Sequence, residues 1–271
     1  MNNICIIGNP KRRSRFDPDL ARKVTEEYEI EERKNLLKKK KAPEINPPSP
    51  QQSDVRTNIK GEVYIRVPNS KVVISRNESY QGLTWENTHY ALADNGLFMS
   101  TPSLFMPYLI QVRDASQGKI ILYTADNKPV PKDEAEDLWK YLSTNHRNGC
   151  WTWLDAKFSE NKNVWKITYN HKTVQKGKDN SLEGITETLE DCIREDCFVD
   201  LEFNKQGLPT RRSQDQTYTQ GENIYYWHPI EGRVAGFVAY SSRANLGCDR
   251  LLSDSSSALG VFACAECTSK S

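Results

Sequence analysis

The chain has 271 residues and a formal net charge of +1, with 37% hydrophobic and 27% charged residues. These values are ordinary for a globular chain of one or two domains, and a charge so close to zero predicts no general attraction to nucleic acid or anionic membranes. The apolar runs fall far short of the roughly 20 residues that cross a bilayer. The opening residues place a short apolar patch before a basic cluster, which is the reverse order of a secretory signal. We therefore expect no membrane association and a cytoplasmic or virion-associated protein.

The first residues are predicted to lie outside the folded domain. Residues 1–41 hold 12 Lys or Arg against 7 Asp or Glu, and they predict a charged tail and helix with Pro18 in its first turn. Residues 42–56 carry four prolines and predict an extended linker. A weak apolar stripe along the helix, which includes Leu20 and Val24, suggests self-association. The folded domain is expected over residues 57–268.

This domain carries signals for two helices and several short strands. Thr84 and Gly96 bracket one helix, and residues 132–142 place apolar side chains on one face of another. The pattern predicts an α+β fold with two helices and several short antiparallel strands. The first two strands should form a hairpin. The β-type runs lie at residues 62–67, 71–75, 151–158, 163–169, 197–203 and 224–227.

Residues of catalytic and metal-binding types show no motif spacing. Seven cysteines, an odd number, indicate free and mostly buried thiols rather than a disulfide framework. Cys264 and Cys267 have half of a zinc-ribbon spacing, but no second short-spaced pair supports it. Asp155 and Asp200 lie outside any EF-hand pattern. The sequence therefore predicts no metal site, no cofactor and no catalytic residues. The histidines, which also lack ligand-like spacing, are His89, His146, His171 and His228.

Four segments of the domain resemble one known protein family. Together they resemble the archaeal and viral variable proteins that are targets of diversity-generating retroelements, or paralogues of such targets. The resemblance covers about residues 80–268 and implies a C-type lectin fold of the formylglycine-generating-enzyme-like subtype. The last segment is the most specific of the four. The segments are Thr84–His89 (TWENTH), Gly149–Asp155 (GCWTWLD), Tyr225–Pro229 (YYWHP) and Arg233–Glu266, which ends ALGVFACAE.

In that family a fixed scaffold displays a variable C-terminal region, because a reverse transcriptase recopies the end of the gene with errors at adenines. The resemblance implies that residues 225–266 form a non-enzymatic binding face for a protein or cell-surface ligand, and no nucleic-acid partner is expected. Tyr240 and Phe262 are the contacts we expect to matter most, since aromatic side chains offer large area at low entropic cost. The implied ligand-binding positions are Gly236, Val238, Tyr240, Ser242, Asn245, Gly247, Asp249, Leu251, Ser253, Asp254, Ser255, Ser256, Ser257, Phe262 and Ala263.

Two features of this segment agree with a variable face. Residues 236–242 and 245–251 alternate between implied variable positions and small or apolar ones such as Phe237 and Leu246, so each set would occupy one face of a strand. A turn or bulge at residues 243–244 would restore the register. In addition, residues 232–265 contain no Lys, Glu, Gln, Met or Trp, although these types make up 60 of the 271 residues. Adenine mutagenesis of an AAC codon reaches none of those five types.

Two other interpretations stay open. One is a fixed paralogue of the same family with a structural or interaction role, assembled through its N-terminal helix. The other is a cysteine-dependent oxidase of the formylglycine-generating type, with Cys248 and Cys264 as candidate thiols. That chemistry requires an accessible thiol in an electropositive environment, whereas both cysteines lie among the implied framework positions.

Overall fold

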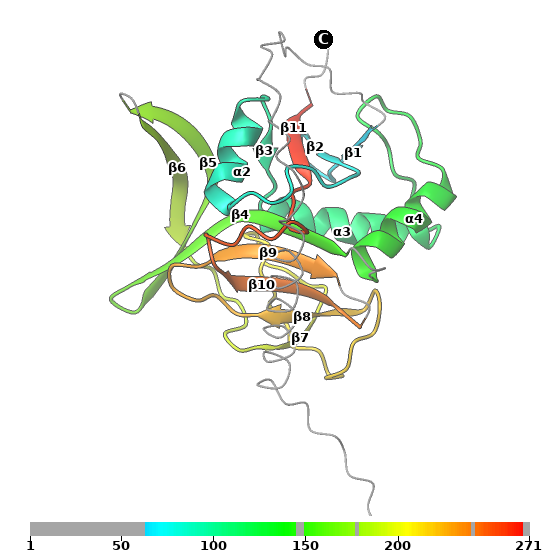
Figure 1. The fold of residues 1–271 in the computed structure, drawn as a ribbon. Coiled ribbons are helices and arrows are strands. Elements are labelled where there is room, and N and C mark those ends of the chain that lie inside the picture. The colour runs from blue at the N-terminus through cyan, green and yellow to red at the C-terminus, as the bar shows by residue number, and fades with distance from the viewer. Residues whose placement is uncertain (1–62, 145–148, 177–178, 240–241, 268–271) are drawn as a thin grey trace, which may run out of the picture. The chain divides into compact units, whose positions relative to one another are not determined.

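The computed structural model describes residues 63–144, 149–176, 179–239 and 242–267. The charged helix and the linker expected over residues 1–56 lie outside these described residues. Two sheets and three helices make up the described part of the chain (Figure 1). None of these three helices is long and apolar enough to cross a membrane.

A four-stranded antiparallel sheet joins the start of the domain to its end. In spatial order its strands are β1 (Tyr64–Arg66), β2 (Val72–Ser75), β11 (Ala263–Glu266) and β3 (Phe98–Met99). The first two strands form the predicted hairpin. Since β11 pairs with both β2 and β3, the C-terminal strand is an inner strand of this sheet.

The larger sheet has seven strands. In spatial order they are β6 (Asp179–Thr188), β5 (Val164–Lys176), β4 (Cys150–Asn161), β9 (Val234–Ala239), β10 (Ala244–Arg250), β8 (Asn223–Trp227) and β7 (Cys197–Asp200). The β8–β10 pair is parallel and the other neighbouring pairs are antiparallel. The β9–β10 hairpin, which with its connecting turn carries seven of the fifteen implied variable positions, therefore lies inside the sheet and not at its edge.

Three helices pack against these sheets, and two of them match the predictions. Helix α2 (Trp85–Ala93) begins at Thr84, whose hydroxyl accepts a hydrogen bond from the Asn87 N–H at 3.3 Å. Helix α4 (Lys132–Ser143) buries Leu138 and Leu142 as the apolar pattern predicts. Helix α3 (Pro102–Ser116) has no counterpart among the predicted elements.

The expected α+β fold with two helices and several short antiparallel strands is wrong. The structure is mostly β, with 39% strand against 19% helix, and it has three described helices. Strands β4, β5 and β6 have 12, 13 and 10 residues, so they are long. The second half of β5 and most of β6 carry polar residues, as in Asn170–Lys172, and their few apolar residues do not show the alternation that marks a half-buried strand. Pro107 within α3 reads as a helix-breaking signal in the sequence.

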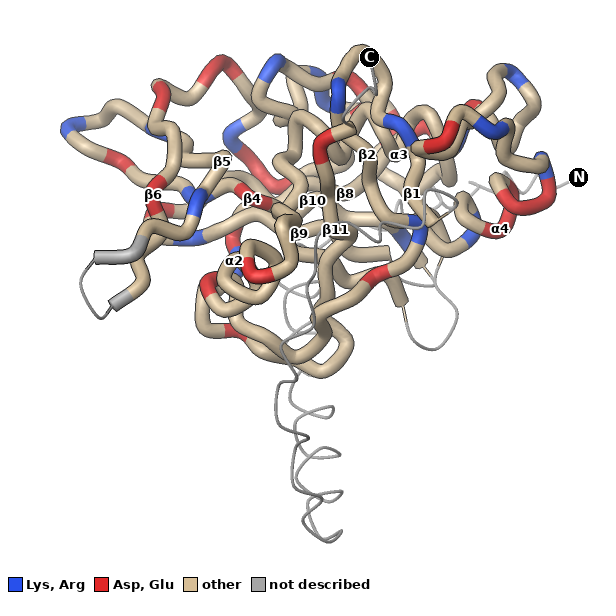
Figure 2. The backbone as a smooth tube through the Cα atoms, turned by 90° about the horizontal axis from the view of Figure 1, so that it is seen from above, with Lys and Arg blue, Asp and Glu red and all other residues tan. Residues whose placement is uncertain are grey.

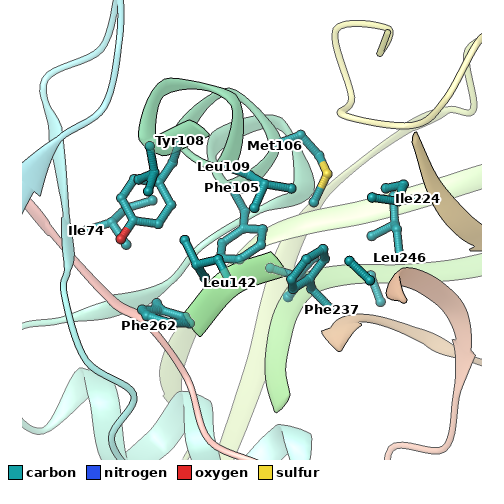
Figure 3. Close-up of a cluster of buried hydrophobic side chains, with 14 of the residues drawn as sticks. Ile74, Phe105, Met106, Tyr108, Leu109, Leu142, Ile224, Phe237, Leu246 and Phe262 are labelled. Carbon is teal, nitrogen blue, oxygen red and sulfur yellow. The ribbon is translucent and has the colours of Figure 1, made fainter. Parts of the chain in front are cut away.

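The core is divided into two hydrophobic clusters by the larger sheet. The larger cluster packs α3 and α4 against one face of β9 and β10; Figure 3 shows Phe105, Leu142 and Phe237 meeting within it. The smaller cluster fills the opposite face and includes Trp85 of α2 together with Val238 of β9. Both faces of the centre of the sheet are therefore closed to solvent.

Charged residues of both signs are spread along the described elements, as Figure 2 shows. Several form exposed ion pairs, such as Arg211 with Asp200 at 2.6 Å and Arg212 with Glu195 at 2.9 Å. Exposed pairs of this kind contribute little stability individually.

Candidate functional site

The β9–β10 hairpin confirms the predicted alternation but not the predicted exposure. Phe237 and Leu246 face each other across the strand pair and belong to the larger core cluster. The other face is also covered, because Val238 is only 2% exposed and packs in the smaller cluster with Trp151 and Trp153. The sequence showed which residues share a face, but it did not show that α2 covers the second face.

Phe262 and Ala263 are likewise buried, which corrects the expectation that Phe262 is a leading ligand contact. The Phe262 ring is fully buried, and its centroid lies 5.9 Å from that of Phe105 and 6.3 Å from that of Tyr141. Its N–H donates to the hydroxyl of Thr152 at 3.2 Å. The segment before β11 is thus part of the scaffold.

The implied binding positions consequently fall into groups that differ in exposure. Only the exposed and partly exposed ones can meet a partner in this conformation. Gly236, Val238, Asn245, Gly247, Phe262 and Ala263 are buried; Asp249, Asp254 and Ser256 are partly exposed; Ser242, Leu251, Ser253, Ser255 and Ser257 are exposed; and Tyr240 lies outside the described residues.

The exposed positions gather in the loop Leu251–Ser257, which we call the display loop. It connects β10 to the segment before β11, and exposure alternates along it: the odd-numbered residues are exposed and the even-numbered ones partly exposed. Leu251 is 53% exposed, a high value for a leucine. A row of alternate side chains in this loop therefore faces solvent.

Hydrogen bonds hold the display loop at several points. The carbonyl of Leu252 accepts from the N–H of Trp85 at 3.2 Å, which ties the loop to the start of α2. The Asp254 carboxylate accepts from the Ser256 N–H at 3.2 Å. Just after the loop, the Gly260 N–H donates to the carbonyl of Trp151 at 2.8 Å. The partly exposed residues thus fix the backbone that carries the exposed ones.

A pocket of about 650 Å³ lies beside the core near α4. Its polar lining includes Arg76, which forms an ion pair with Glu134, and the carboxyl of Glu78. The hydroxyl of Tyr141 donates to Glu78 at 2.7 Å, and burial raises the pKa of Glu78 to about 7. A carboxyl group shifted in this way can exchange a proton near neutral pH. No sequence motif indicates this pocket, because its residues come from separate segments of the chain.

One cluster of metal-ligating side chains escaped the sequence analysis. His89 of α2, Asp155 of β4 and His171 of β5 bring ligand atoms within 4.8 Å of one another. The Asp155 carboxylate lies 2.5 Å from His171 Nδ1 and accepts from the His171 N–H at 2.9 Å. His89 Nε2 lies 3.6 Å from the same carboxylate. Among the residues that the structure describes, this is the group whose donor set could hold a metal ion.

Irregular strand pairing positions two members of this cluster. The β4–β9 register shifts between Leu154 and Lys157, beside Asp155, and the β5–β6 register shifts between Tyr169 and Lys172, beside His171. Such bulges re-aim side chains out of the regular alternation. A polar Asp155 within the apolar run CWTWLDAKF is the one local signal that the sequence offers.

The described cysteines are free thiols, and most are buried, as predicted. Cys248 and Cys264 are fully buried. Burial raises the pKa of both thiols, which opposes formation of the reactive thiolate. This environment is unlike that of a redox-active cysteine.

Comparison with family models, curated proteins and solved structures found no match to this chain. The resemblance to retroelement variable proteins thus rests on the quoted motifs alone. Two features of the described residues bear on function: the display loop and the buried His–Asp–His cluster.

Proposed function

We propose that this chain is a non-enzymatic binding protein that presents exchangeable side chains on the display loop, diversified by retroelement mutagenesis. The observation that carries the proposal is the alternation of exposure from Leu251 to Ser257 on a backbone held by hydrogen bonds. A fixed backbone keeps the entropy cost of binding low. Exposed side chains that do no packing can change without loss of the fold.

The present side chains suit contact with a protein surface. Serine hydroxyls at 253, 255 and 257 both donate and accept hydrogen bonds, and Leu251 adds apolar area. Ser242, exposed after β9, extends the candidate surface. The proposed contact set is therefore smaller than the set implied by the family resemblance, and it centres on the loop rather than on the hairpin.

The thiol-oxidase alternative is less well supported. Cys248 and Cys264 have no exposed surface, and their environment favours the protonated thiol. A substrate cysteine could not reach either sulfur without opening the core. The fixed-paralogue alternative shares the proposed surface and differs only in the history of the gene.

The gene distinguishes diversification from a fixed surface. We expect a second copy of the codons for residues 232–265 near the gene, differing from it at positions where the copy has adenine. Sequencing the locus from independent isolates should then show amino-acid changes at Ser253, Ser255 and Ser257 but not at Phe237 or Leu246. A segment identical in all isolates, with no second copy, would favour the fixed paralogue. Changes spread equally over core and loop codons would contradict the proposal.

A further inference from the structure

The buried cluster of His89, Asp155 and His171 contains a polar atom without a partner. The three side chains are 3%, 3% and 5% exposed. His89 Nε2 is buried and makes no hydrogen bond, and it lies 3.6 Å from the Asp155 carboxylate, beyond hydrogen-bonding range. A buried polar atom left in this state costs free energy, and such atoms are rare in folded proteins. The nitrogen is therefore available to bind a ligand that the protein itself does not supply.

The geometry points to a metal site: we propose that His89, Asp155 and His171 bind one divalent transition-metal ion, with Zn²⁺ as the first candidate. This proposal is independent of the display loop's function. Two imidazoles and one carboxylate are a donor set that suits zinc and related ions, whereas Ca²⁺ and Mg²⁺ prefer oxygen ligands throughout. Their ligand atoms already lie within 4.8 Å of one another, and zinc binds such atoms at about 2.0–2.2 Å.

The surroundings of the cluster hold its side chains in place. The Trp85 ring packs edge-on against His89 and His171, with centroid distances of 4.4 and 4.9 Å. Its indole N–H donates to the Leu154 carbonyl at 3.0 Å, next to Asp155. A Cβ atom at Gly184 would lie only 2.9 Å from His171 Nε2, so β6 also restricts that ring. Oriented side chains of this kind raise the affinity of a metal site.

The burial of the cluster assigns the ion a structural role. It would link α2 to β4 and β5, and because ligands from distant segments meet only in the folded chain, metal binding adds to the stability of the fold. The same Trp85 residue donates its backbone N–H to Leu252 in the display loop. The metal would therefore also fix the helix start on which the loop rests.

The test is zinc binding by the full chain with a variant that removes one ligand atom. Chain freed of metal by a chelator is loaded with Zn²⁺, and metal content and Tm are measured after removal of free ion. We expect one zinc per chain and a higher Tm. His89→Phe keeps an aromatic ring against Trp85 and breaks no hydrogen bond of Nε2, so it should fold without metal, retain no zinc and show no Tm increase. His89→Gln, measured alongside, should also lose the zinc-dependent increase.

His228→Gln is the matched control, because His228 lies outside the cluster and pairs with Asp196 at 2.6 Å. This variant should bind zinc as the unchanged chain does. Two results would overturn the proposal. In one, the unchanged chain retains no zinc. In the other, both His89 variants keep the zinc content and Tm increase of the unchanged chain, which would place the ion outside this cluster.

Discussion

At the scale of single residues, Phe262 and Ser255 should differ in their effect on stability, because Phe262 is buried in the core and Ser255 is exposed in the display loop. Phe262→Ala should lower the free energy of unfolding by about 3–5 kcal/mol, because the buried ring leaves a cavity. Ser255→Ala removes an exposed hydroxyl and should change it by less than about 0.5 kcal/mol. Urea unfolding of both variants provides the measurement. Equal effects would show that Phe262 is not a core residue.

Glu78 should make the free energy of unfolding depend on pH in a predictable direction. Burial raises its pKa from 4.5 to about 7 in the folded state. Between these values the unfolded chain releases a proton that the folded chain keeps, so the contribution of Glu78 to stability falls as the pH rises. Glu78→Gln removes this contribution and should reduce the loss of stability between pH 4.5 and pH 7. Urea midpoints at both ends of the range test this; an unchanged difference would argue against a buried, protonated Glu78.

The residue types in the hairpin predicted which side chains share a face of the sheet, but they did not predict whether each face is exposed. The small and apolar positions Phe237, Leu246 and Cys248 are in the core, as their alternation indicates. Val238 and Phe262 are buried by segments that are far away in the sequence, and the local alternation of residue types carries no information about such contacts. The His–Asp–His cluster is of the same kind, since its members come from three different elements.

At the scale of elements, the sequence predicted correctly those helices whose ends and faces are determined by neighbouring residues. The Thr84 cap and the apolar face of α4 gave two helices with nearly correct ends. The β5–β6 ribbon was predicted only as far as residue 169, because most side chains in its remainder are polar and show no regular alternation. Its pairing depends on contacts such as Thr168 with Thr186 at 2.9 Å. Cross-strand pairs of this type become visible only when the partner strand is known.

The start of α3 is held by a close backbone approach at Gly207. Gly207 has φ of +80°, and an added Cβ would lie 2.2 Å from the Pro102 carbonyl carbon, so Gly207→Ala must displace backbone. Gly232 has a similar φ of +71° with open space around it. Gly232→Ala should cost about 1–2 kcal/mol from the backbone conformation alone. Gly207→Ala should cost at least about 1–3 kcal/mol more through overpacking. Thermal unfolding compares them, and equal losses would contradict the close approach.

At the scale of the whole molecule, the two core clusters determine where a partner can bind. They close both faces of the central sheet around β9, so the hairpin supports the surface and the display loop forms it. The Trp85 region connects this loop to the proposed metal site. A rigid frame with one exposed row of side chains is the arrangement that the proposed function needs.

A substitution library over residues 232–265, sorted for folded chains by resistance to protease, separates exchangeable positions from positions that the fold requires. We expect Leu251, Ser253, Ser255 and Ser257 to accept nearly all residue types, because their side chains are exposed. Polar residues should be strongly depleted at Phe237, Leu246 and Phe262, which are buried. If the loop positions proved as intolerant as these core positions, the display loop could not be an exchangeable binding surface.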